Sequence, residues 1–510
     1  MSDITSTDVL IIGGGPTGLA LACDLTRRGV ACLLLERAAR PATASRAKTI
    51  QPRTLEVADD LGVIDRILEL GATHVPTRLY DRDRVVSEKV EVAADATSPH
   101  APYAPIWLSQ PLLEGILRDR LAELGGRLEM GTQVTAVTQH HGGVTATVRT
   151  ASGIRRVHAR YAVGCDGGRS FVRQQIGVQL QGVSYTEHRW HLADVRVHGL
   201  EPGRQHLWTS PEHGILSLFP LPSTDIWQFQ ASIPADQTDP PEPSLELLRH
   251  IFAERAAVPG VTITDADWLS LYRINVCLAD RYRVDRVFLA GDAAHIHSPA
   301  GGQGMNTGVQ DAYNLGWKLA AVLTGADAAL LDTYEQERRP VAQAVLDDST
   351  ARLHAVMQAA GSSDGSSPHK GLTGDFTTGL TIGYPNSPLS QGPTAGGRAP
   401  DAPCKDASTR RTVRLFDLQR GPHWTLLSFG DHATDLPQAT LPLRAYRITT
   451  DPSAAGPTTV IDIDGHAHRA YDALDGETVL IRPDGYIATR CPTHAVRDVL
   501  ARALAPATAH

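Results

Sequence analysis

One sixteen-residue stretch, GDAAHIHSPAGGQGMN at positions 291–306, concentrates side chains that could do chemistry. Asp292, His295 and His297 could bind a metal ion, but histidines spaced i and i+2 lack further ligands at a recognised spacing. A helix that begins near Asn306 would present its positive end to an anion. The stretch also holds three glycines that would let the backbone approach a planar ring: Gly301, Gly302 and Gly304. The pattern favours a nucleotide-binding loop over a metal site.

A second glycine cluster lies near the N-terminus, where GxGxxG directly follows the apolar run Val9–Ile12. Gly13 would permit a tight turn, Gly15 would let a pyrophosphate approach the backbone, and Gly18 would let the next helix pack closely on the strand. A helical pattern and a second apolar strand follow, and Glu36 stands at the end of that strand. This complete unit predicts a dinucleotide-binding turn, with Glu36 accepting hydrogen bonds from a ribose.

The elements around these motifs predict how the residues are positioned. An apolar strand at 285–290 precedes the 291–306 stretch and a helical pattern follows it, which argues against a mobile surface loop. In the segment 226–233, IWQFQASI, apolar and polar residues alternate, so one face of an antiparallel strand is apolar. That face packs a core or lines a substrate pocket. Trp227 and Phe229 are the pocket-lining candidates if the second alternative holds.

Composition and charge narrow the class of protein. The chain has 510 residues, which favours two or three domains, with 42% hydrophobic and 20% charged residues. A net charge of −8 without a long basic run argues against a nucleic-acid or anionic-membrane partner. The six cysteines form no CxxC pair, and neither a signal peptide nor a membrane-spanning run is evident. We therefore expect a cytoplasmic protein that acts on small molecules.

The order of these patterns predicts an α/β chain with a discontinuous first domain. We expect a dinucleotide-binding domain from residues 1–178 with 284–360, and an inserted β-sheet substrate domain at 179–283. Residues 361–400 are rich in Gly, Ser and Pro, which predicts a linker region. Residues 401–510 would form a further domain that contains the strand candidates at 424–430 and 479–490.

The sequence resembles the FAD-dependent aromatic hydroxylases of the para-hydroxybenzoate hydroxylase type, especially the bacterial polyketide hydroxylases and phenol monooxygenases. Three motifs support the resemblance in order: GxGxxG at Gly13, GCDGGRS around Asp166, and the Gly-Asp motif at Asp292. Weaker signatures, GGRAPD and VLIRPDGYIATR, cover the C-terminal part. The resemblance implies a Rossmann-type FAD-binding domain, an inserted substrate sheet and a thioredoxin-like C-terminal domain that lacks CxxC.

The resemblance also implies roles for residues at the adenosine half of FAD. Glu36 would bind the ribose, and Arg37 would lie beside the adenine, which the backbone of Val134 would contact. Arg46 resembles the family arginine near the pyrophosphate that also serves the nicotinamide cofactor. The pyrophosphate turn itself would comprise Gly13, Gly15, Pro16, Thr17 and Gly18.

At the flavin half, Gln110 resembles the glutamine that reaches the ribityl side. Asp166 resembles the acid that is linked to both cofactors, and Asp292 would hydrogen-bond the ribityl chain. The isoalloxazine would lie along a final set of residues, with the N–H groups of the last two near its pyrimidine end: Pro299, Gly301, Gly302, Gly304, Met305 and Asn306.

The resemblance implies a monooxygenase that uses O₂ and a flavin C4a-hydroperoxide to hydroxylate an aromatic substrate, as in antibiotic biosynthesis. The chain has a single dinucleotide fingerprint, so NADPH or NADH would bind only transiently. No catalytic protein residue is assigned, because the reactive oxygen belongs to the cofactor. Two alternatives stay open: Baeyer–Villiger oxygenation of a polyketide ketone, and a noncatalytic FAD-binding assembly protein. Assembly into a homodimer is also left open.

Overall fold

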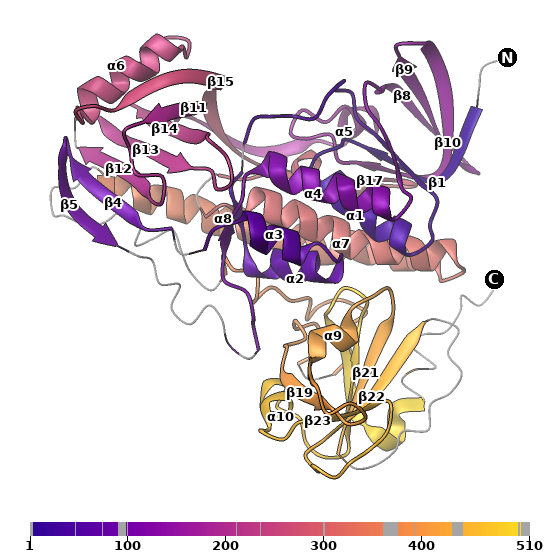
Figure 1. Ribbon diagram of the computed structural model, residues 1–510. Coiled ribbons are helices and arrows are strands. Elements are labelled where there is room, and N and C mark those ends of the chain that lie inside the picture. The colour runs from indigo at the N-terminus through magenta and orange to yellow at the C-terminus, as the bar shows by residue number, and fades with distance from the viewer. Residues whose placement is uncertain are drawn as a thin grey trace.

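The computed structural model describes residues 4–45, 47–73, 75–89, 98, 100–210, 212–234, 236–298, 301–360, 376–392, 394–430, 442–497 and 500. Within these residues the chain forms three large sheets and a small two-stranded one, β3 (Thr49–Ile50) with β6 (Ile106–Trp107). The large sheets occupy separate parts of the molecule, and helices lie between them (Figure 1).

The first sheet contains the strand that precedes the N-terminal glycine cluster. Its strands run in the order β16 (Arg283–Val284), β17 (Val287–Leu289), β10 (Gly153–Gly164), β1 (Ile4–Ile12), β2 (Cys32–Leu35) and β7 (Arg127–Glu129). The pairs from β17 to β7 are parallel, whereas β8 (Gln133–His140) and β9 (Gly143–Thr150) extend β10 as an antiparallel ribbon. The ends of the parallel strands are buried on both faces and read as continuous apolar runs, such as Val9–Ile12 and Cys32–Leu35.

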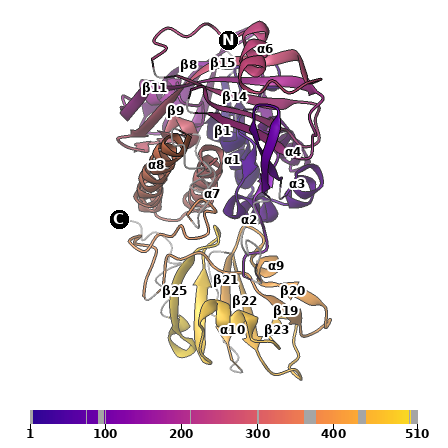
Figure 2. The ribbon, with the colours of Figure 1, turned by 90° about the vertical axis from the view of Figure 1, so that its left-hand side faces the viewer.

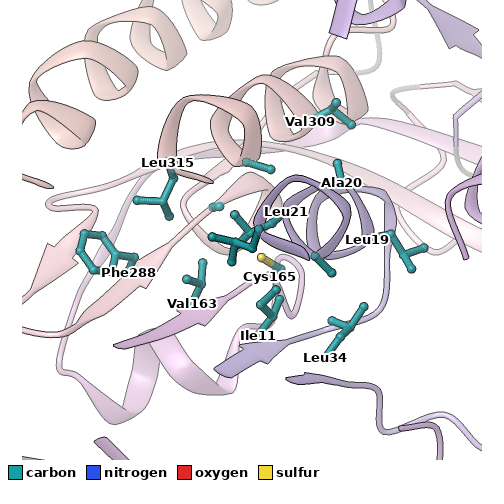
Figure 3. Close-up of a cluster of buried hydrophobic side chains, with 14 of the residues drawn as sticks. Ile11, Leu19, Ala20, Leu21, Leu34, Val163, Cys165, Phe288, Val309 and Leu315 are labelled. Carbon is teal, nitrogen blue, oxygen red and sulfur yellow. The ribbon is translucent and has the colours of Figure 1, made fainter. Parts of the chain in front are cut away.

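The core of this part forms around helix α1 (Pro16–Arg27), which packs against α4 (Gln110–Glu123) and α7 (Gly304–Leu323). Figure 3 shows Ile11 of β1, Leu21 of α1 and Leu315 of α7 gathered in one cluster. These side chains are fully buried, and each contributes roughly 1.5–3 kcal/mol by leaving water. The cluster holds the N-terminus of α1 against the end of β1.

The second sheet is mostly antiparallel and lies beside the first (Figure 1). Its order is β18 (His295–Ile296), β15 (Thr262–Ala279), β11 (Leu180–His198), β14 (Trp227–Ile233), β13 (Gly214–Pro220), β12 (Gln205–Ser210), β4 (Thr77–Asp81) and β5 (Arg84–Lys89). Helix α6 (Leu245–Arg255) covers one face through Leu248 and Ile251. The long helix α8 (Asp332–Ala360) contacts β15 where Leu353 packs on Ile274.

The second sheet draws on more of the chain than the predicted insert at 179–283. Strands β4 and β5 lie in the segment that we predicted to belong to the first domain. They join the second sheet instead, because β4 pairs in parallel with β12 and β5 pairs with β4. Strand β18, which contains His295, joins the same sheet by pairing with β15. The division is therefore less simple than a single insertion, and the other predicted domain boundaries stay predictions.

The third sheet forms the C-terminal part, which lies below α2 (Pro52–Asp60) and α7 in Figures 1 and 2. Its order is β20 (Thr412–Arg414), β19 (Pro403–Asp406), β23 (Thr459–Ile461), β22 (Leu443–Thr449), β21 (Trp424–Phe429), β24 (Glu477–Ile481) and β25 (Ile487–Pro492). Helices α9 (Leu415–Gln419) and α10 (His466–Tyr471) accompany it. The central parallel strands and mixed sheet agree with the predicted thioredoxin-like domain.

The remaining regular elements are short. They are α3 (Ile64–Leu70), α5 (Phe171–Gln175), and the 3-10 turns η1 (Gly291–Ala293), η2 (Ala328–Leu331) and η4 (Thr493–Ala495). None of the described helices combines the length and apolar character needed to cross a membrane. Residues 361–375 of the predicted linker lie outside the described residues, but Ile382 and Tyr384 within it are buried.

Candidate functional site

The turn after β1 has the geometry that a dinucleotide pyrophosphate requires. Gly13 has a φ of +112°, and a Cβ there would overlap the carbonyl oxygen of Cys165. A Cβ on Gly18 would overlap the carbonyl oxygen of Gly13, so α1 packs directly on the end of its own strand. Gly15 is the N-cap of α1, and a Cβ there would meet nothing within 4 Å. The turn thus leaves open space before the unpaired N–H groups of a helix N-terminus.

Glu36 lies beside this turn, at the end of β2. Its Oε2 accepts a hydrogen bond from the Gly14 N–H at 2.7 Å, and its Oε1 accepts one from the Ala38 N–H at 2.8 Å. The backbone N–H of Thr132 donates to the Glu36 carbonyl oxygen at 2.8 Å, which brings the start of β8 alongside. Val134 is buried on that strand, and Arg37 next to Glu36 is exposed. The glycine turn, Glu36 and the start of β8 therefore lie side by side.

Asp166 follows β10 and lies against the same turn, because a Cβ on Gly13 would come 2.9 Å from its Cα. Its Oδ2 accepts hydrogen bonds from the N–H groups of Phe171 at 2.7 Å and Val172 at 3.1 Å, and its Oδ1 accepts one from the Ser170 hydroxyl. In the structure Asp166 thus fixes the start of α5. The predicted link of this carboxylate to two cofactors stays a prediction.

The two histidines of the 291–306 stretch belong to a buried chain of hydrogen bonds. His297 Nε2 lies 2.6 Å from His295 Nδ1, and Asp311 accepts from His295 Nε2 at 2.6 Å and from Arg338 Nε at 2.7 Å. Burial opposes ionisation of Asp311, but the charges of His295 and Arg338 lower its pKa to about 2. Burial, together with His295, holds the pKa of His297 well below its usual range. The histidines therefore anchor the stretch to α7 and α8.

Asp292 is exposed, in contrast to these two buried histidines. It lies in η1. Burial raises the pKa of Tyr272 on β15 to about 12, and the negative charge of Asp292 contributes to that shift. The charge of Asp292 therefore influences a residue of the second sheet, although Asp292 itself follows a strand of the first.

The glycine loop before α7 is tied to the short strand β3. Asn306 Nδ2 donates to the carbonyl oxygens of Thr49 at 2.9 Å and Gly302 at 2.7 Å, while its Oδ1 accepts from the Gln51 N–H at 2.9 Å. Gln51 Nε2 also donates to the Gly301 carbonyl oxygen at 3.1 Å. Gly301 and Gly302 have φ values of +88° and +61°. Gly304 and Met305 begin α7, whereas Pro299 lies outside the described residues.

The segment before β3 also meets the N-terminus of α4. The Gln110 N–H donates to the Ala47 carbonyl oxygen at 3.0 Å, and the Gln110 side chain donates to Glu114 Oε1 at 2.8 Å. Leu108 donates to the Lys48 carbonyl oxygen at 2.8 Å. The segment 47–51 therefore contacts Gln110 through Ala47 and the glycine loop through Thr49 and Gln51. Arg46 of this segment lies outside the described residues.

Trp227 and Phe229 are 4% and 0% exposed and pack in the core beneath α6. The structure therefore favours the core alternative for this face of β14, and their predicted pocket role is not supported. The reason is the alternation of the strand: Gln228 and Gln230 point to the opposite face, where Gln228 meets Ser45 and Lys48 of the segment before β3. There Gln228 donates through Nε2 to the Ser45 carbonyl oxygen at 2.6 Å.

Sequence reasoning missed three residues on this polar face. Gln228 pairs in register with Asp194 of β11, and Asp194 Oδ2 accepts from the Ser45 N–H at 2.6 Å. Lys48 Nζ donates to Gln228 Oε1 at 3.0 Å. The sequence could have indicated Gln228, because Gln228 and Gln230 occupy the polar positions of the alternating segment 226–233 and so share one face of the strand. The sequence alone could not have indicated Lys48 and Asp194. Their proximity depends on how the segment 45–48 packs on β11 and β14.

The described residues fit FAD. The open space at Gly15 follows the end of β1 and Glu36 follows the end of β2, where such folds bind nucleotides, and the glycine loop at 301–304 precedes α7 beside β3. Glu36 would hold the ribose, and the N–H groups of Met305 and Asn306 at the start of α7 would face an electron-rich ring. When bound, FAD supplies the electron transfer and the reaction with O₂.

The parallel sheet and the glycine-rich turn after β1 together define a dinucleotide-binding protein. Residues 6–349 match the family described as FAD binding domain, and residues 392–508 match the family described as aromatic-ring hydroxylase, C-terminal. The chain therefore belongs to the family of FAD-dependent aromatic hydroxylases and is a monooxygenase of that family. The predicted family, enzyme class and fold are confirmed.

Similar proteins extend over nearly the whole chain. A flavin-dependent monooxygenase of Mycobacteroides abscessus is 40% identical over 499 residues, covering 96% of this chain and 98% of the relative. The 6-methylpretetramide 4-monooxygenase of Streptomyces rimosus is 33% identical, covering 97% and 92%. The crystal structure of a ternary complex of aklavinone-11 hydroxylase with FAD and aklavinone superposes with a TM-score of 0.83 at 28% identity, covering 99% and 100%.

Proposed function

We propose that this chain uses NADPH or NADH, bound FAD and O₂ to hydroxylate an aromatic polyketide or a phenol. The supporting observation is the junction at β3, where the glycine loop and the polar face of the second sheet are held to the same backbone segment. A flat ring bound between them would contact both the flavin loop and the side chains of β11 and β14. Relatives that act on aromatic polyketides and phenols support the substrate class.

We propose the following roles for residues that bind FAD and the nicotinamide cofactor. Gly13, Gly15, Pro16, Thr17 and Gly18 would hold the pyrophosphate, and Glu36, Arg37 and Val134 the adenosine. Asp166, Asp292 and Gln110 would serve the ribityl side, and Arg46 the pyrophosphate and the nicotinamide. Pro299, Gly301, Gly302, Gly304, Met305 and Asn306 would line the flavin ring. Because the chain has one dinucleotide-binding turn, the nicotinamide would visit the flavin domain and leave.

The test has two stages. Anaerobic mixing of the FAD-loaded protein with NADPH or NADH should bleach the flavin absorbance near the visible maximum. Aerobic turnover with a panel of polycyclic phenols and isotopically labelled O₂ should then yield a product that has gained a ring hydroxyl carrying the label. An ester or lactone product would support the Baeyer–Villiger alternative instead. Failure of both nicotinamides to reduce the flavin, or release of H₂O₂ alone with every phenol, would contradict the proposal.

A further inference from the structure

Lys48 lies between Trp107 of β6 and the polar face of the second sheet. Its backbone is fixed on one side by Leu108, which donates to its carbonyl oxygen, and its neighbour Thr49 accepts from Asn306 of the glycine loop. The lysine therefore begins directly beside the proposed flavin ring. Its side chain extends the other way, to the polar face of the second sheet, where Nζ donates to Gln228 Oε1 at 3.0 Å.

The ammonium of Lys48 is surrounded by aromatic rings. Nζ lies 4.0 Å from the centroid of the Phe219 ring and 5.8 Å from that of the Trp107 ring. No described carboxylate forms an ion pair with it, and an ammonium has three N–H donors of which Gln228 takes one. A partly buried cation with spare donors over the Phe219 ring, which itself packs edge-on against Trp107, suits an aromatic ligand that carries a negatively charged oxygen.

Asp194 provides a second, independent observation at the same place. Its side chain is 1% exposed, and its Oδ2 accepts the hydrogen bond from Ser45. The other oxygen, Oδ1, is buried and has no hydrogen-bond partner among the described residues. A buried carboxylate oxygen without a partner is costly, and a donor on a bound molecule, such as a neighbouring hydroxyl group, would satisfy it.

Resting on the proposed function, we propose that Lys48 is the residue that selects the substrate, by binding the ionised oxygen of an acidic phenol while Asp194 accepts a hydrogen bond from an adjacent hydroxyl. The phenolic proton leaves to solvent, and Lys48 keeps its own protons. Lys48 is thus a specificity-determining residue for aromatic rings that bear neighbouring oxygens.

The proposal makes binding depend on pH in two directions. Burial lowers the pKa of Lys48 to about 8, partly offset by the negative charge of Asp194 on β11. Burial raises the pKa of Asp194 to about 6, and Asp267 on β15 adds to that effect. The described parts of β6, β13 and β14 present no other charged group to Lys48. Affinity for an acidic phenol should therefore rise as the phenol ionises and fall again above about pH 8, when Lys48 loses its charge.

The test uses alizarin, a diphenol with neighbouring hydroxyl groups whose visible colour reports its ionisation, and the oxidised FAD-loaded protein without NADPH or O₂. Alizarin should bind as the coloured anion. Lys48→Met should weaken that binding at least about tenfold, the loss expected for one charge-assisted hydrogen bond. Lys48→Arg should retain binding and abolish the alkaline fall in affinity, because the guanidinium stays charged. Lys405→Met, the same change at an exposed position on β19, should alter neither.

Bound FAD and the melting temperature of each variant show whether the fold is kept. If the wild-type protein binds the alizarin anion no more tightly than Lys48→Met does, or if Lys48→Arg keeps the alkaline fall, the assignment of Lys48 is wrong. Because this titration needs no turnover, such a result would leave the proposed monooxygenase reaction standing. Failure of flavin reduction or of labelled-oxygen incorporation would instead count against the reaction itself.

Discussion

Two buried aspartates show how neighbours set the charge of a side chain. Asp311 contacts His295 and Arg338, and its pKa falls to about 2 in spite of burial. Asp194 has only a backbone N–H and a more distant lysine, and its pKa rises to about 6. Desolvation acts on both, so the difference comes from the cations in contact with Asp311, which Asp194 lacks, and from the negative charge of Asp267 near Asp194.

This contrast predicts opposite pH dependences of stability. The folded-state pKa of Asp311 lies below its usual 3.8, so its ionisation stabilises the fold above about pH 4, and this contribution disappears as the pH falls toward 2. Asp311→Asn should cost about 3–5 kcal/mol near pH 7, because it leaves the Arg338 charge buried and unpaired. Urea unfolding should show that the gap to the wild type narrows between about pH 4 and pH 2.

Asp194→Asn provides the matched comparison. The folded-state pKa of Asp194 lies above 3.8, so the fold loses stability from this group as the pH rises from about 4 to about 6. The asparagine should therefore be relatively more stable than the wild type at neutral pH than at about pH 4. If both variants responded to pH in the same direction, the explanation by contact cations would be wrong.

At the scale of elements, the crossing of α1 and α7 depends on missing side chains. A Cβ on Gly308 would overlap the Thr17 hydroxyl, and a Cβ on Gly316 would overlap Asp24 Oδ2. Asp24 cannot move aside freely, because Arg27 and Arg28 both hydrogen-bond its carboxylate at 2.8 and 2.9 Å. The two helices therefore approach closely enough to support the glycine-rich turn.

Gly316→Ala should lower the free energy of unfolding by about 1–3 kcal/mol through overpacking, although alanine favours a helix. Gly115 offers a control in the middle of α4, where the nearest atom to a new Cβ is the flexible end of Arg118 at 3.7 Å. Gly115→Ala should stabilise by about 0.5–1 kcal/mol. Chemical unfolding of both variants measures the difference, and equal effects would contradict the crossing argument.

The elements also show what the sequence could and could not reveal. The turn at Gly13 and the acid at Glu36 were predictable, because the strand, turn and helix are consecutive in the sequence and Gly13 and Gly18 are required by close contacts within that unit. The contact between the polar face of β14 and the segment 45–48 could not be predicted, since alternation identifies two faces of a strand without indicating what covers each. The membership of β4 in the second sheet was equally hidden, because it depends on pairing with a strand more than a hundred residues away.

At the scale of the molecule, the C-terminal part is joined to the flavin domain by buried charges. Arg482 donates to both oxygens of Glu337 on α8, at 2.6 and 2.9 Å, and Lys318 of α7 donates to Glu337 at 2.7 Å. All three side chains are fully buried or nearly so. Asp484, in the predicted hairpin turn of residues 483–485, accepts from Trp317 at 3.0 Å. A turn that the sequence marks only as a connection thus forms the interface.

Glu337→Ala should separate the unfolding of the two parts. The wild-type chain should melt in a single calorimetric transition. The variant removes the carboxylate that Arg482 and Lys318 share; Arg482 keeps its ion pair with Asp484, but Lys318 stays buried without a carboxylate partner among the described residues, at a cost of about 3–5 kcal/mol. We expect a second, earlier transition from the C-terminal part. Glu123→Gln, which breaks an exposed ion pair with Arg66, should leave the single transition in place. A single transition in Glu337→Ala at the wild-type temperature would refute the role of the interface.

The segment 290–298 begins at the end of β17 in the first sheet and reaches β18 in the second. It is therefore a covalent strap between the two sheets, clamped in the middle by the buried hydrogen bonds of His295 and Asp311. This strap limits how far the ends of β17 and β18 can separate, so it constrains the spacing of the two sheets at the place where we propose that a flat ring binds. Larger aromatic skeletons would have to be accommodated by side chains on the sheet faces, not by opening the molecule.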